Sequence, residues 1–554
     1  MNSTAFLDLL EIQILRVTFS RQFSCSKMKT VTLMVSGIFL LSNLDAAAPA
    51  KILFVYPVPT ASHYTAFIPL IEELARRGHE VTAYTVFKGK QSIPNYKEIL
   101  ITLGEPAPPL SEFKSLYLRW KNKIFYINYI RDFFTPMTES FLRTKEFKDL
   151  LQSKEKYDLV IVEALFSMEC LLALGHRFNA PVVNYNALFL SPWVAQLLGQ
   201  PHSFSYIPDF RLPYTDQINF WGRIHNTAVG MYEILAGNFY HLPIHEELMR
   251  KYFKYPGSET LPTLRELIQN ISITLVDSHT ILNSVRPYSP NVVDVAGIQT
   301  EVLEKLPQDL QKFMDDAKEG VVFFSFGSII DSRSFPVHWQ QMLVETMKSL
   351  KYKVIWRWHE KVDGADHILS KSWLPQKEIL AHPNCKLFIT HGGYNGMMEA
   401  QNVGIPVIGM PFFSDQYHDF KFYEQYGLGF EVDFDTMTAA EFRDKINHVI
   451  QTPSYQKNAK KLANYFHDLP QTSLEKSIFW VEYVIRHNGA HHLRPAAVDM
   501  PYYQYLLIDV IAFFTISVLA IVFIFVYFVR KFLSLIVSGK TRSSRSKTRN
   551  KKQN

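Results

Sequence analysis

The segment from residue 386 to residue 416 constrains the fold more than any other part of the chain. An apolar run ends at His391-Gly392-Gly393, and a helical pattern begins near Asn395. This order directs backbone N–H groups and the positive end of a helix toward one point, where an anion binds well. The two glycines have no Cβ atoms, so a phosphate can approach the main chain. We therefore predict a phosphate-binding turn between a buried strand and a helix.

The polar residues around this turn suit a nucleotide-sugar. His391 can donate a hydrogen bond to the same phosphate, and Glu399, one helical turn further on, could accept from ribose hydroxyls. The next strand leads to Asp415 and Gln416, a carboxylate and an amide that can grip vicinal sugar hydroxyls. The alternative is a plain βα turn with incidental polar residues. The turn is not a P-loop, because no Gly-Lys-Ser/Thr ends it, and it lacks the Gly-x-Gly-x-x-Gly of dinucleotide folds.

Together these residues resemble the signature of the UDP-glycosyltransferase family. The matching positions are Thr390, His391, Gly392, Gly393, Asn395, Gly396, Glu399, Pro406, Pro411, Asp415 and Gln416. The resemblance extends from about Lys51 to the C-terminus and is strongest to the membrane-bound animal branch, with an invertebrate-like character. It implies an α/β protein of the GT-B type, with two doubly wound parallel-sheet domains that face a cleft. In that arrangement the N-terminal domain binds the acceptor and the C-terminal domain binds the UDP-sugar.

Length and charge agree with a membrane-attached enzyme of two domains. A chain of 554 residues is too long for a single core. The net charge of +6 is misleading, because nine Lys and Arg residues and no acidic residue follow position 529. Without them the body carries about −3, so composition gives no case for a nucleic-acid partner. The three cysteines, Cys25, Cys170 and Cys385, are too few for a disulfide framework, and we expect buried thiols.

We assign residues 1–48 to an N-terminal extension and a signal peptide. Met28-Lys29 supplies a basic start, an apolar run follows over 31–41, and small residues precede position 49. This is the order of a secretory signal. A membrane anchor is the alternative, but the run is short for one. The first 27 residues do not resemble a leader, and they are excluded from the fold assignment.

Residues 49–285 are predicted to form the N-terminal acceptor-binding α/β domain. A strand at 51–55 is followed by His63 in a loop, a helix over 64–77 and a strand over 81–86. A later strand at 157–162 ends in Glu163. Ligands of parallel sheets bind beyond the carboxyl ends of the strands, where both side chains fall. The alternative for His63 is a surface histidine at a helix start.

The family resemblance implies a catalytic role for both residues. The family places its catalytic histidine in the loop after the first strand, and Ala61-Ser62-His63-Tyr64 matches that place. A carboxylate partner orients the ring and stabilises its protonated form. The family often has Asp at the end of the later strand, whereas this chain has Glu163, whose longer side chain changes the reach of the pair.

Two further features of this domain bear on function. Residues 189–254 are rich in aromatics and prolines without a strand period, and they are predicted to form a helix-and-loop wall of the acceptor pocket, or else a merely structural insertion. Asn270-Ile271-Ser272 is a glycosylation sequon, which requires entry into the secretory lumen.

Residues 286–487 are predicted to form the C-terminal UDP-sugar-binding domain, with its first elements near Asn291. Ser328 follows a strand at 321–326, so its hydroxyl can meet the diphosphate. Trp373 offers a flat face for the base, and Gln376 can satisfy base or ribose edges. Core packing is the alternative for the tryptophan. In the family's fold the last helix, here 473–487, crosses back to the first domain.

The remaining segments predict a single-pass membrane protein. Residues 488–509 form a lumenal juxtamembrane segment, and residues 510–529 contain no charge and are long enough to span a bilayer. Residues 530–554 are a basic tail, which places the tail in the cytosol and the catalytic domains in the lumen. Lys551-Lys552 resembles a dilysine signal for the endoplasmic reticulum membrane, and a generic stop-transfer tail is the alternative.

The predicted reaction is transfer of a hexose, expected to be glucose, from a UDP-sugar to a small lipophilic acceptor. His63 would act as general base with inversion at the anomeric carbon, and leaving-group charge would meet His391, Ser328 and the helix start at Asn395-Gly396. No Asp-x-Asp pair lies near the cleft, so no metal is expected, and the UDP-sugar is a co-substrate rather than a cofactor. The alternatives are a UDP-glucuronosyltransferase and a catalytically silent nucleotide-sugar-binding membrane subunit. The sequence leaves homo- or hetero-oligomers open.

Overall fold

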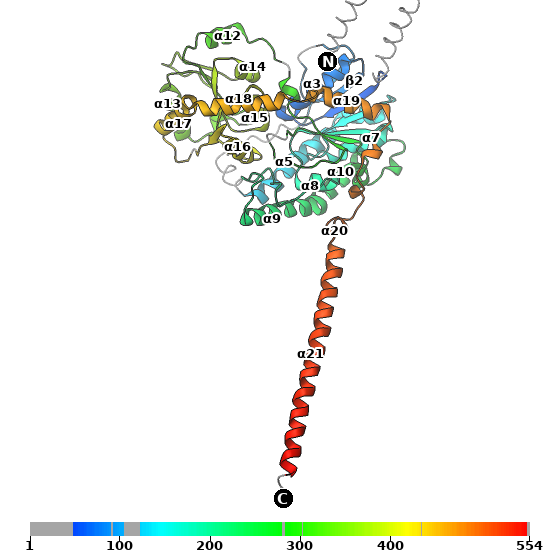
Figure 1. The fold of residues 1–554 in the computed structure, drawn as a ribbon. Coiled ribbons are helices and arrows are strands. Elements are labelled where there is room, and N and C mark those ends of the chain that lie inside the picture. Colours follow the sequence, from blue (N-terminus) through cyan, green and yellow to red (C-terminus); the bar gives the residue numbers. More distant parts are fainter. Residues whose placement is uncertain are drawn as a thin grey trace, which may run out of the picture.

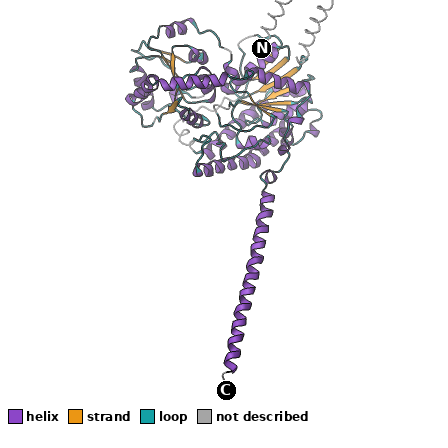
Figure 2. Ribbon diagram, viewed as in Figure 1, coloured by secondary structure: helices purple, strands orange, loops and turns teal. Residues whose placement is uncertain are grey.

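The computed structural model describes residues 48–89, 92–104, 122–279, 283–301, 303–328, 330–433 and 435–550, with side chains up to 538. Two parallel sheets, each flanked by helices, form two lobes, and one long helix extends away from the body (Figures 1 and 2). The predicted signal peptide and Lys551-Lys552 lie outside the described residues.

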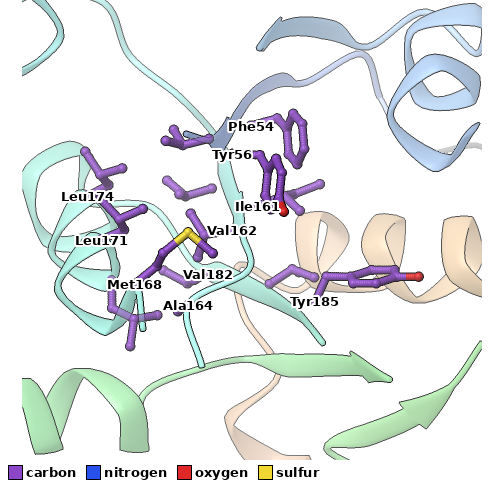
Figure 3. Packing of buried hydrophobic residues seen from close by; sticks show 14 of the residues in the cluster. Phe54, Tyr56, Ile161, Val162, Ala164, Met168, Leu171, Leu174, Val182 and Tyr185 are labelled. Atoms are coloured by element: carbon purple, nitrogen blue, oxygen red, sulfur yellow. The ribbon is translucent and has the colours of Figure 1, made fainter. Parts of the chain in front are cut away.

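The N-terminal lobe is built on a seven-stranded sheet of order β3-β2-β1-β4-β5-β6-β7, in which every pairing is parallel. Its strands are β1 (Lys51–Tyr56), β2 (Glu80–Thr85), β3 (Tyr96–Leu100), β4 (Leu159–Val162), β5 (Val182–Asn186), β6 (Ile273–Val276) and β7 (Val292–Asp294). The central strands are continuous apolar runs because helices cover both faces of the sheet. Figure 3 shows this core, with Phe54, Ile161, Leu171 and Tyr185 packed among its buried side chains.

The C-terminal lobe has a six-stranded parallel sheet of order β10-β9-β8-β11-β12-β13. Its strands are β8 (Val321–Ser325), β9 (Lys353–Arg357), β10 (Ile368–Lys371), β11 (Cys385–Thr390), β12 (Val407–Gly409) and β13 (Gly429–Glu431). In both sheets the strand order reverses direction next to the first strand, as in doubly wound folds. Ligands bind at such switch points, beyond the carboxyl ends of the strands.

The helices of the N-terminal lobe connect and cover its strands. They are α3 (Ala61–Arg76), α5 (Lys123–Arg143), α6 (Lys145–Gln152), η1 (Glu169–Leu172), α7 (Ala173–Phe178), α8 (Pro192–Leu197), α9 (Phe220–Ala236), η2 (Gly237–His241), α10 (Leu242–Tyr252), η3 (Ser258–Thr260) and α11 (Leu264–Gln269). The region expected to be helix and loop, 189–254, is therefore α8 to α10, and η2 is a π-helical turn.

The helices of the C-terminal lobe and of the C-terminal extension follow. They are η4 (Ile298–Thr300), α12 (Gln308–Asp315), η5 (Ser332–Ser334), α13 (Val337–Lys348), α14 (Gln376–Ala381), α15 (Tyr394–Val403), α16 (Gln416–Gln425), α17 (Ala439–Gln451), α18 (Pro453–His467), α19 (Ser473–Arg486), η6 (His491–Leu493), η7 (Ala496–Val498), α20 (Tyr502–Tyr505) and α21 (Ile508–Asn550).

Helix α19 returns to the N-terminal lobe, as the fold type implies. Glu475 accepts a hydrogen bond from Arg77 at 2.6 Å, and Lys476 lies 2.5 Å from Asp294. Ile478, Val481 and Val484 are part of the core of the first sheet. The end of the chain therefore ties the two lobes together.

Three expectations about the elements were wrong. The strand at Val292–Asp294 pairs with β6, so it completes the first sheet rather than opening the second. Helix α3 begins at Ala61, which places His63 inside its first turn and not in the preceding loop. Strands β3, β6, β10 and β13 were missed. Strands β3 and β10 are partly exposed edge strands without a continuous apolar run, and β6 and β13 are only four and three residues long.

Helix α21 is the single candidate membrane span among the described residues. Its apolar part runs from Ile508 to Ser538, and the most apolar stretch of it is not buried by any of the described residues. The helix is longer than the predicted 510–529 because the basic tail continues it. Figure 1 shows it projecting from one end of the N-terminal lobe.

Candidate active site

A cleft with about 1450 Å³ of open space lies between the carboxyl ends of the two sheets. The lobes contribute opposite walls. The predicted site residues that line it are His63, Ser328, Trp373, Gln376, His391, Asn395, Gly396, Glu399, Asp415 and Gln416. Glu163 lies directly behind His63. One cavity thus holds residues that are up to 353 positions apart in the chain.

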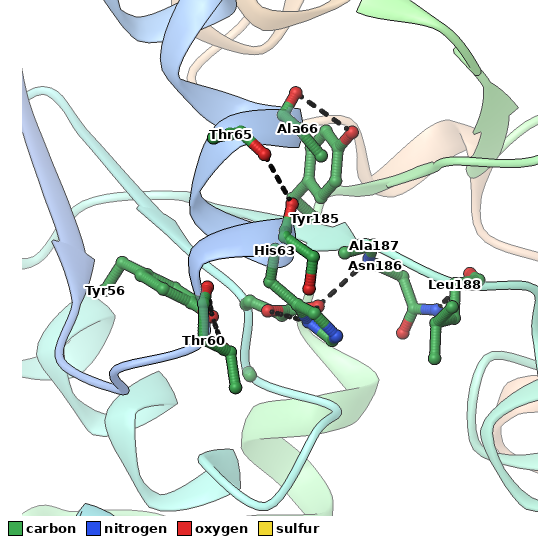
Figure 4. Close-up of polar contacts among 12 residues, drawn as sticks. Tyr56, Thr60, His63, Thr65, Ala66, Tyr185, Asn186, Ala187 and Leu188 are labelled. Carbon is green, nitrogen blue, oxygen red and sulfur yellow. Dashed lines mark hydrogen bonds and ion pairs between the residues drawn. The ribbon is translucent and has the colours of Figure 1, made fainter. Parts of the chain in front are cut away.

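His63 and Glu163 form a hydrogen-bonded pair (Figure 4). Nδ1 of His63 lies 2.9 Å from both carboxylate oxygens of Glu163, and the carboxylate is buried at the end of β4. The backbone N–H of Ala187 donates to the same carboxylate at 3.0 Å. Because an ionised carboxylate only accepts, the proton of the neutral ring is on Nδ1, and Nε2 carries the lone pair. Glu163 therefore reaches the histidine despite its extra methylene.

Acidic neighbours raise the pKa of His63. Burial by itself would lower this pKa, but the charge and hydrogen bond of Glu163 outweigh it, and Asp415 and Asp277 add to the effect. Asp277 was missed by the sequence analysis. It directly follows the buried strand β6, and a carboxylate at the end of a parallel strand could have been predicted to face the cleft. Burial raises the pKa of Asp277 to about 8.

The first turn of α3 is fixed from several sides. Thr65 Oγ1 donates to the Ser62 carbonyl at 3.0 Å, and the hydroxyl of Tyr185 donates to the Ala66 carbonyl at 3.3 Å (Figure 4). The ring of Phe166 lies 4.6 Å from that of His63, centre to centre. These contacts hold the imidazole at the cleft.

The ring of His391, just after the end of β11, lies against two glycines. A Cβ on Gly327 or Gly393 would lie 2.7 or 2.5 Å from its ring, so both positions exclude a side chain. Thr390 Oγ1 accepts from the N–H of Gly392 and lies 3.3 Å from His391 Nδ1. In the tautomer whose Nδ1 accepts from this hydroxyl, Nε2 is an N–H donor. Burial, with the positive charge of Arg357, lowers the pKa of His391 to about 3.

Asn395 links the lobes. Its side-chain amide donates to the carbonyl of Ser62 at 2.8 Å, next to His63. This side-chain N–H therefore forms a hydrogen bond between the two lobes. The backbone N–H groups of Asn395 and Gly396 belong to the first turn of α15, where helical N–H groups have no partner within the helix. These N–H groups could donate to an anion placed at this turn.

Trp373, Gln376 and Glu399 line the wall of the cleft that the C-terminal lobe contributes. Gln376 donates to Glu399 at 2.7 Å, and the indole of Trp373 is 62% exposed at the mouth of the cleft. Burial raises the pKa of Glu399 to about 7, although Gln376 and Lys377 act in the opposite direction.

Asp415 and Gln416 lie nearer to His63. The carboxamide oxygen of Gln416 accepts from the N–H groups of Phe412 and Phe413 at 2.7 and 3.1 Å, which leaves its NH₂ group for a ligand. Asp415 is buried, and one of its carboxyl oxygens has no hydrogen-bond partner among the described residues. Burial raises the pKa of Asp415.

A second cavity opens from the His63 side of the cleft. It shares Phe166, Leu188 and Tyr126 with the cleft and is much narrower than the cleft. Aromatic side chains, among them Trp193, line its inner part. The cavity lies within the region that was expected to form an acceptor wall.

One group of described residues could hold a metal ion. Glu169, His241 and His245 are buried, and their ligand atoms lie within 4.8 Å of one another. The carboxylate lies within 3.3 Å of a nitrogen of each ring. Burial opposes its ionisation, but the interactions with His241 and His245 lower the pKa of Glu169 to about 2, and burial lowers the pKa of His245 to about 4. Glu169 and His241 line the second cavity, and none of the three residues lines the cleft.

The predicted glycosylation site is on the surface. Asn270 is exposed at the end of α11, and Arg494 approaches its side-chain oxygen at 3.5 Å. The serine of the sequon, Ser272, is buried.

Comparison with known proteins gave one family match and many relatives. The family model described as "UDP-glucoronosyl and UDP-glucosyl transferase" matches residues 50–543. The UDP-glycosyltransferase UGT5 of Dactylopius coccus is 34% identical over 522 residues, covering 91% of this chain and 97% of its own. The UDP-glucosyltransferase 2 of the same organism is 31% identical over 483 residues, covering 86% and 92%.

Solved structures share the fold at lower identity. The crystal structure of a UDP-glucose: anthocyanidin 3-O-glucosyltransferase in complex with UDP is 17% identical, with a TM-score of 0.51. The match covers 79% of this chain and 99% of that one. This likeness establishes the GT-B fold.

Proposed function

This chain belongs to the UDP-glucuronosyl and UDP-glucosyl transferase family and is a UDP-sugar glycosyltransferase, and we propose that it transfers glucose to small lipophilic acceptors with inversion. The observation that carries the mechanism is the His63–Glu163 pair, which faces the anion-binding turn across one cleft.

His63 is the proposed general base. Its Nε2 would take the proton of the acceptor hydroxyl while the oxygen attacks the anomeric carbon, and Glu163 would stabilise the resulting imidazolium. Attack from the His63 side, opposite the diphosphate, inverts the anomeric centre. The raised pKa of His63 makes it a stronger base than a free imidazole.

The leaving diphosphate would be received by the opposite lobe. The N–H groups at the start of α15, Nε2–H of His391 and the hydroxyl of Ser328 can stabilise its developing charge. His391 remains a neutral donor because its pKa is about 3. No step of this mechanism requires a metal ion.

Glucose is favoured over glucuronate as the donor sugar. The sugar would lie between His63 and the pair Asp415 and Gln416, and the buried carboxylate of Glu163 lies directly behind His63. A glucuronate carboxylate would add negative charge to this acidic group. The relative named UDP-glucosyltransferase 2 supports the same choice.

The second cavity is the proposed acceptor pocket. Its aromatic side chains suit a flat phenol or alcohol, whose hydroxyl would meet His63 past Phe166. The lining also contains the charged residues Arg131, Glu169, Arg211 and Glu233, which could bind a polar group of the acceptor. We further propose that α21 anchors the enzyme in the endoplasmic reticulum membrane with both lobes in the lumen. The basic residues that follow Val529 support this orientation.

The test is UDP release by microsomes that contain the full chain, with UDP-glucose, UDP-glucuronate and UDP-xylose and a panel of phenolic acceptors. Acceptor-dependent release with UDP-glucose, a β-linked product by NMR and activity that survives EDTA are expected. A retained anomer or loss of activity with EDTA contradicts the mechanism, and preference for UDP-glucuronate contradicts the donor. A silent sugar-nucleotide binder would release no more UDP than its His63→Ala variant.

A further inference from the structure

Helix α9 and the η2 turn carry a stripe of exposed apolar side chains. We define this α9 stripe as Phe220, Trp221, Ile224, Leu235 and Phe239. Trp221 and Phe239 are 74% and 79% exposed, and the other three are between 47% and 59% exposed. Isolated exposed apolar residues are common, but five large ones on one side of a helix and the turn that follows it suit an interaction surface.

The spacing shows that the stripe is one face of the helix. Phe220, Ile224 and Leu235 are separated by four and eleven residues, which brings them to the same side at 100° per residue. The opposite side contains the buried residues Asn226 and Val229, which face the lobe. The helix is therefore apolar on its outer face as well as packed on its inner face.

A short series of contacts connects the stripe to the base of the membrane anchor. Asn238, next to Phe239, donates to Gln196 of α8 at 3.0 Å. Gln200, just beyond α8, accepts from the hydroxyl of Tyr505 in α20 at 3.1 Å. Helix α21 begins three residues later. Figure 1 shows α9 lying along the end of the body from which α21 leaves.

We propose that the α9 stripe lies in the head-group region of the bilayer that α21 spans. This proposal rests on the membrane anchor put forward under Proposed function. Tryptophan and phenylalanine on an exposed helix face are typical of helices that lie in the membrane interface. The N-terminal lobe then has two attachments to lipid, a spanning helix and a helix lying along the surface.

The second attachment fixes the acceptor pocket relative to the membrane. Glu233, on the buried side of α9, lines the proposed acceptor pocket. One helix diameter, about 10 Å, then separates the pocket from the lipid surface. A lipophilic acceptor that partitions into the bilayer would be concentrated beside the enzyme.

The test measures lipid contact in the full-length protein. Three single-cysteine variants, Phe239→Cys, Val337→Cys and Phe525→Cys, are labelled with an environment-sensitive fluorophore in a background with Cys25 replaced by serine; Cys170 and Cys385 are buried. Each is reconstituted in phosphatidylcholine nanodiscs with and without doxyl-labelled lipid. Val337 is the matched control, because it is an apolar side chain, 68% exposed, on the C-terminal lobe.

Quenching of the labels at 239 and 525, with none at 337, is the expected result. If the label at 525 is quenched and that at 239 is not, the stripe does not touch lipid and the proposal is overturned while the anchor stands. If the label at 525 is not quenched, the anchor itself fails. A label at 239 that is shielded from solvent but not quenched by lipid would indicate a second copy of the chain on the stripe, which also overturns the proposal.

A second variant distinguishes lipid contact made by the stripe from lipid contact caused by the fluorophore itself. Leu235→Glu places a charge on the stripe at a position that is 51% exposed in the lobe, so folding is retained. Quenching at Phe239→Cys should fall at least about two-fold in this background if the stripe enters the head-group region. Unchanged quenching would contradict the placement of the stripe in the head-group region.

Discussion

Two histidines enter the cleft from opposite lobes, and their surroundings give them opposite chemistry. His63 is surrounded by the carboxyl groups of Glu163, Asp415 and Asp277, and its pKa is raised. His391 is enclosed by glycines and lies near a guanidinium, and its pKa is lowered to about 3. Burial lowers both pKa values, so the sign of the neighbouring charge decides the difference.

The difference teaches how one residue type can serve both partners of a transfer reaction. The first ring can hold the proton that it removes from the acceptor. The second ring does not become charged near neutral pH and can only donate a hydrogen bond to the diphosphate. Each prediction below perturbs one side of this comparison.

The largest effect is expected from His63→Ala. Loss of the base should reduce kcat with the preferred acceptor by about 10³-fold, within the range for general-base catalysis. UDP release at saturating substrate measures it. The melting temperature should be measured alongside, because the ring is only 12% exposed and its loss leaves the buried Glu163 carboxylate with the N–H of Ala187. A variant with more than a tenth of the parental kcat would remove His63 from the mechanism.

Glu163→Gln should have the next largest effect and should alter the pH dependence. The amide keeps an oxygen for the N–H of Ala187 but loses the charge that raises the pKa of His63. We expect kcat/KM to fall by about 10- to 100-fold. The acidic limb of the pH–rate profile should move to lower pH, because the imidazole loses its proton more readily. Glu163→Asp, which keeps the charge, is the control, and an unmoved acidic limb in the glutamine variant would contradict the pairing.

His391→Ala should weaken donor binding without moving the pH profile. The loss of one hydrogen bond to a charged phosphate is worth about 1.5–3 kcal/mol, roughly a 10- to 150-fold rise in KM for the UDP-sugar. Because the pKa of His391 is about 3, the acidic limb between pH 5 and 8 should coincide with that of the parent. A shifted limb would mean that this ring also titrates, which would remove the contrast between the two histidines.

Asn395→Ala tests the contact between the two lobes and should have the smallest effect. It deletes the hydrogen bond to the Ser62 carbonyl, worth about 0.5–1.5 kcal/mol. We expect a two- to ten-fold loss in kcat/KM with little change in the melting temperature. Asn395→Asp, which cannot donate to the carbonyl, should behave like the alanine variant. Full activity in both would show that the lobes need no such link.

The sequence allowed the donor side of the site to be predicted more completely than the acceptor side. Residues 386–416 are nearly contiguous, so the glycine turn, His391 and Glu399 are positioned by one strand–turn–helix unit. Asp277 and Arg357 could not be identified as neighbours of the two histidines. Asp277 directly follows β6 and Arg357 is the last residue of β9. Only the pairing of each strand within its sheet brings these residues to the cleft.

The sequence alone determined the two parallel sheets, the glycine-rich turn and the apolar anchor, because each depends on the period and type of residues close together in the chain. Tertiary structure decided that Glu163 reaches His63 across 100 residues, that Asn395 bonds to the opposite lobe, and that β7 completes the first sheet. It also decided the charge of each histidine. A pKa depends on the burial and the charges that surround a group in space, and neither is encoded in the neighbouring residues of the chain.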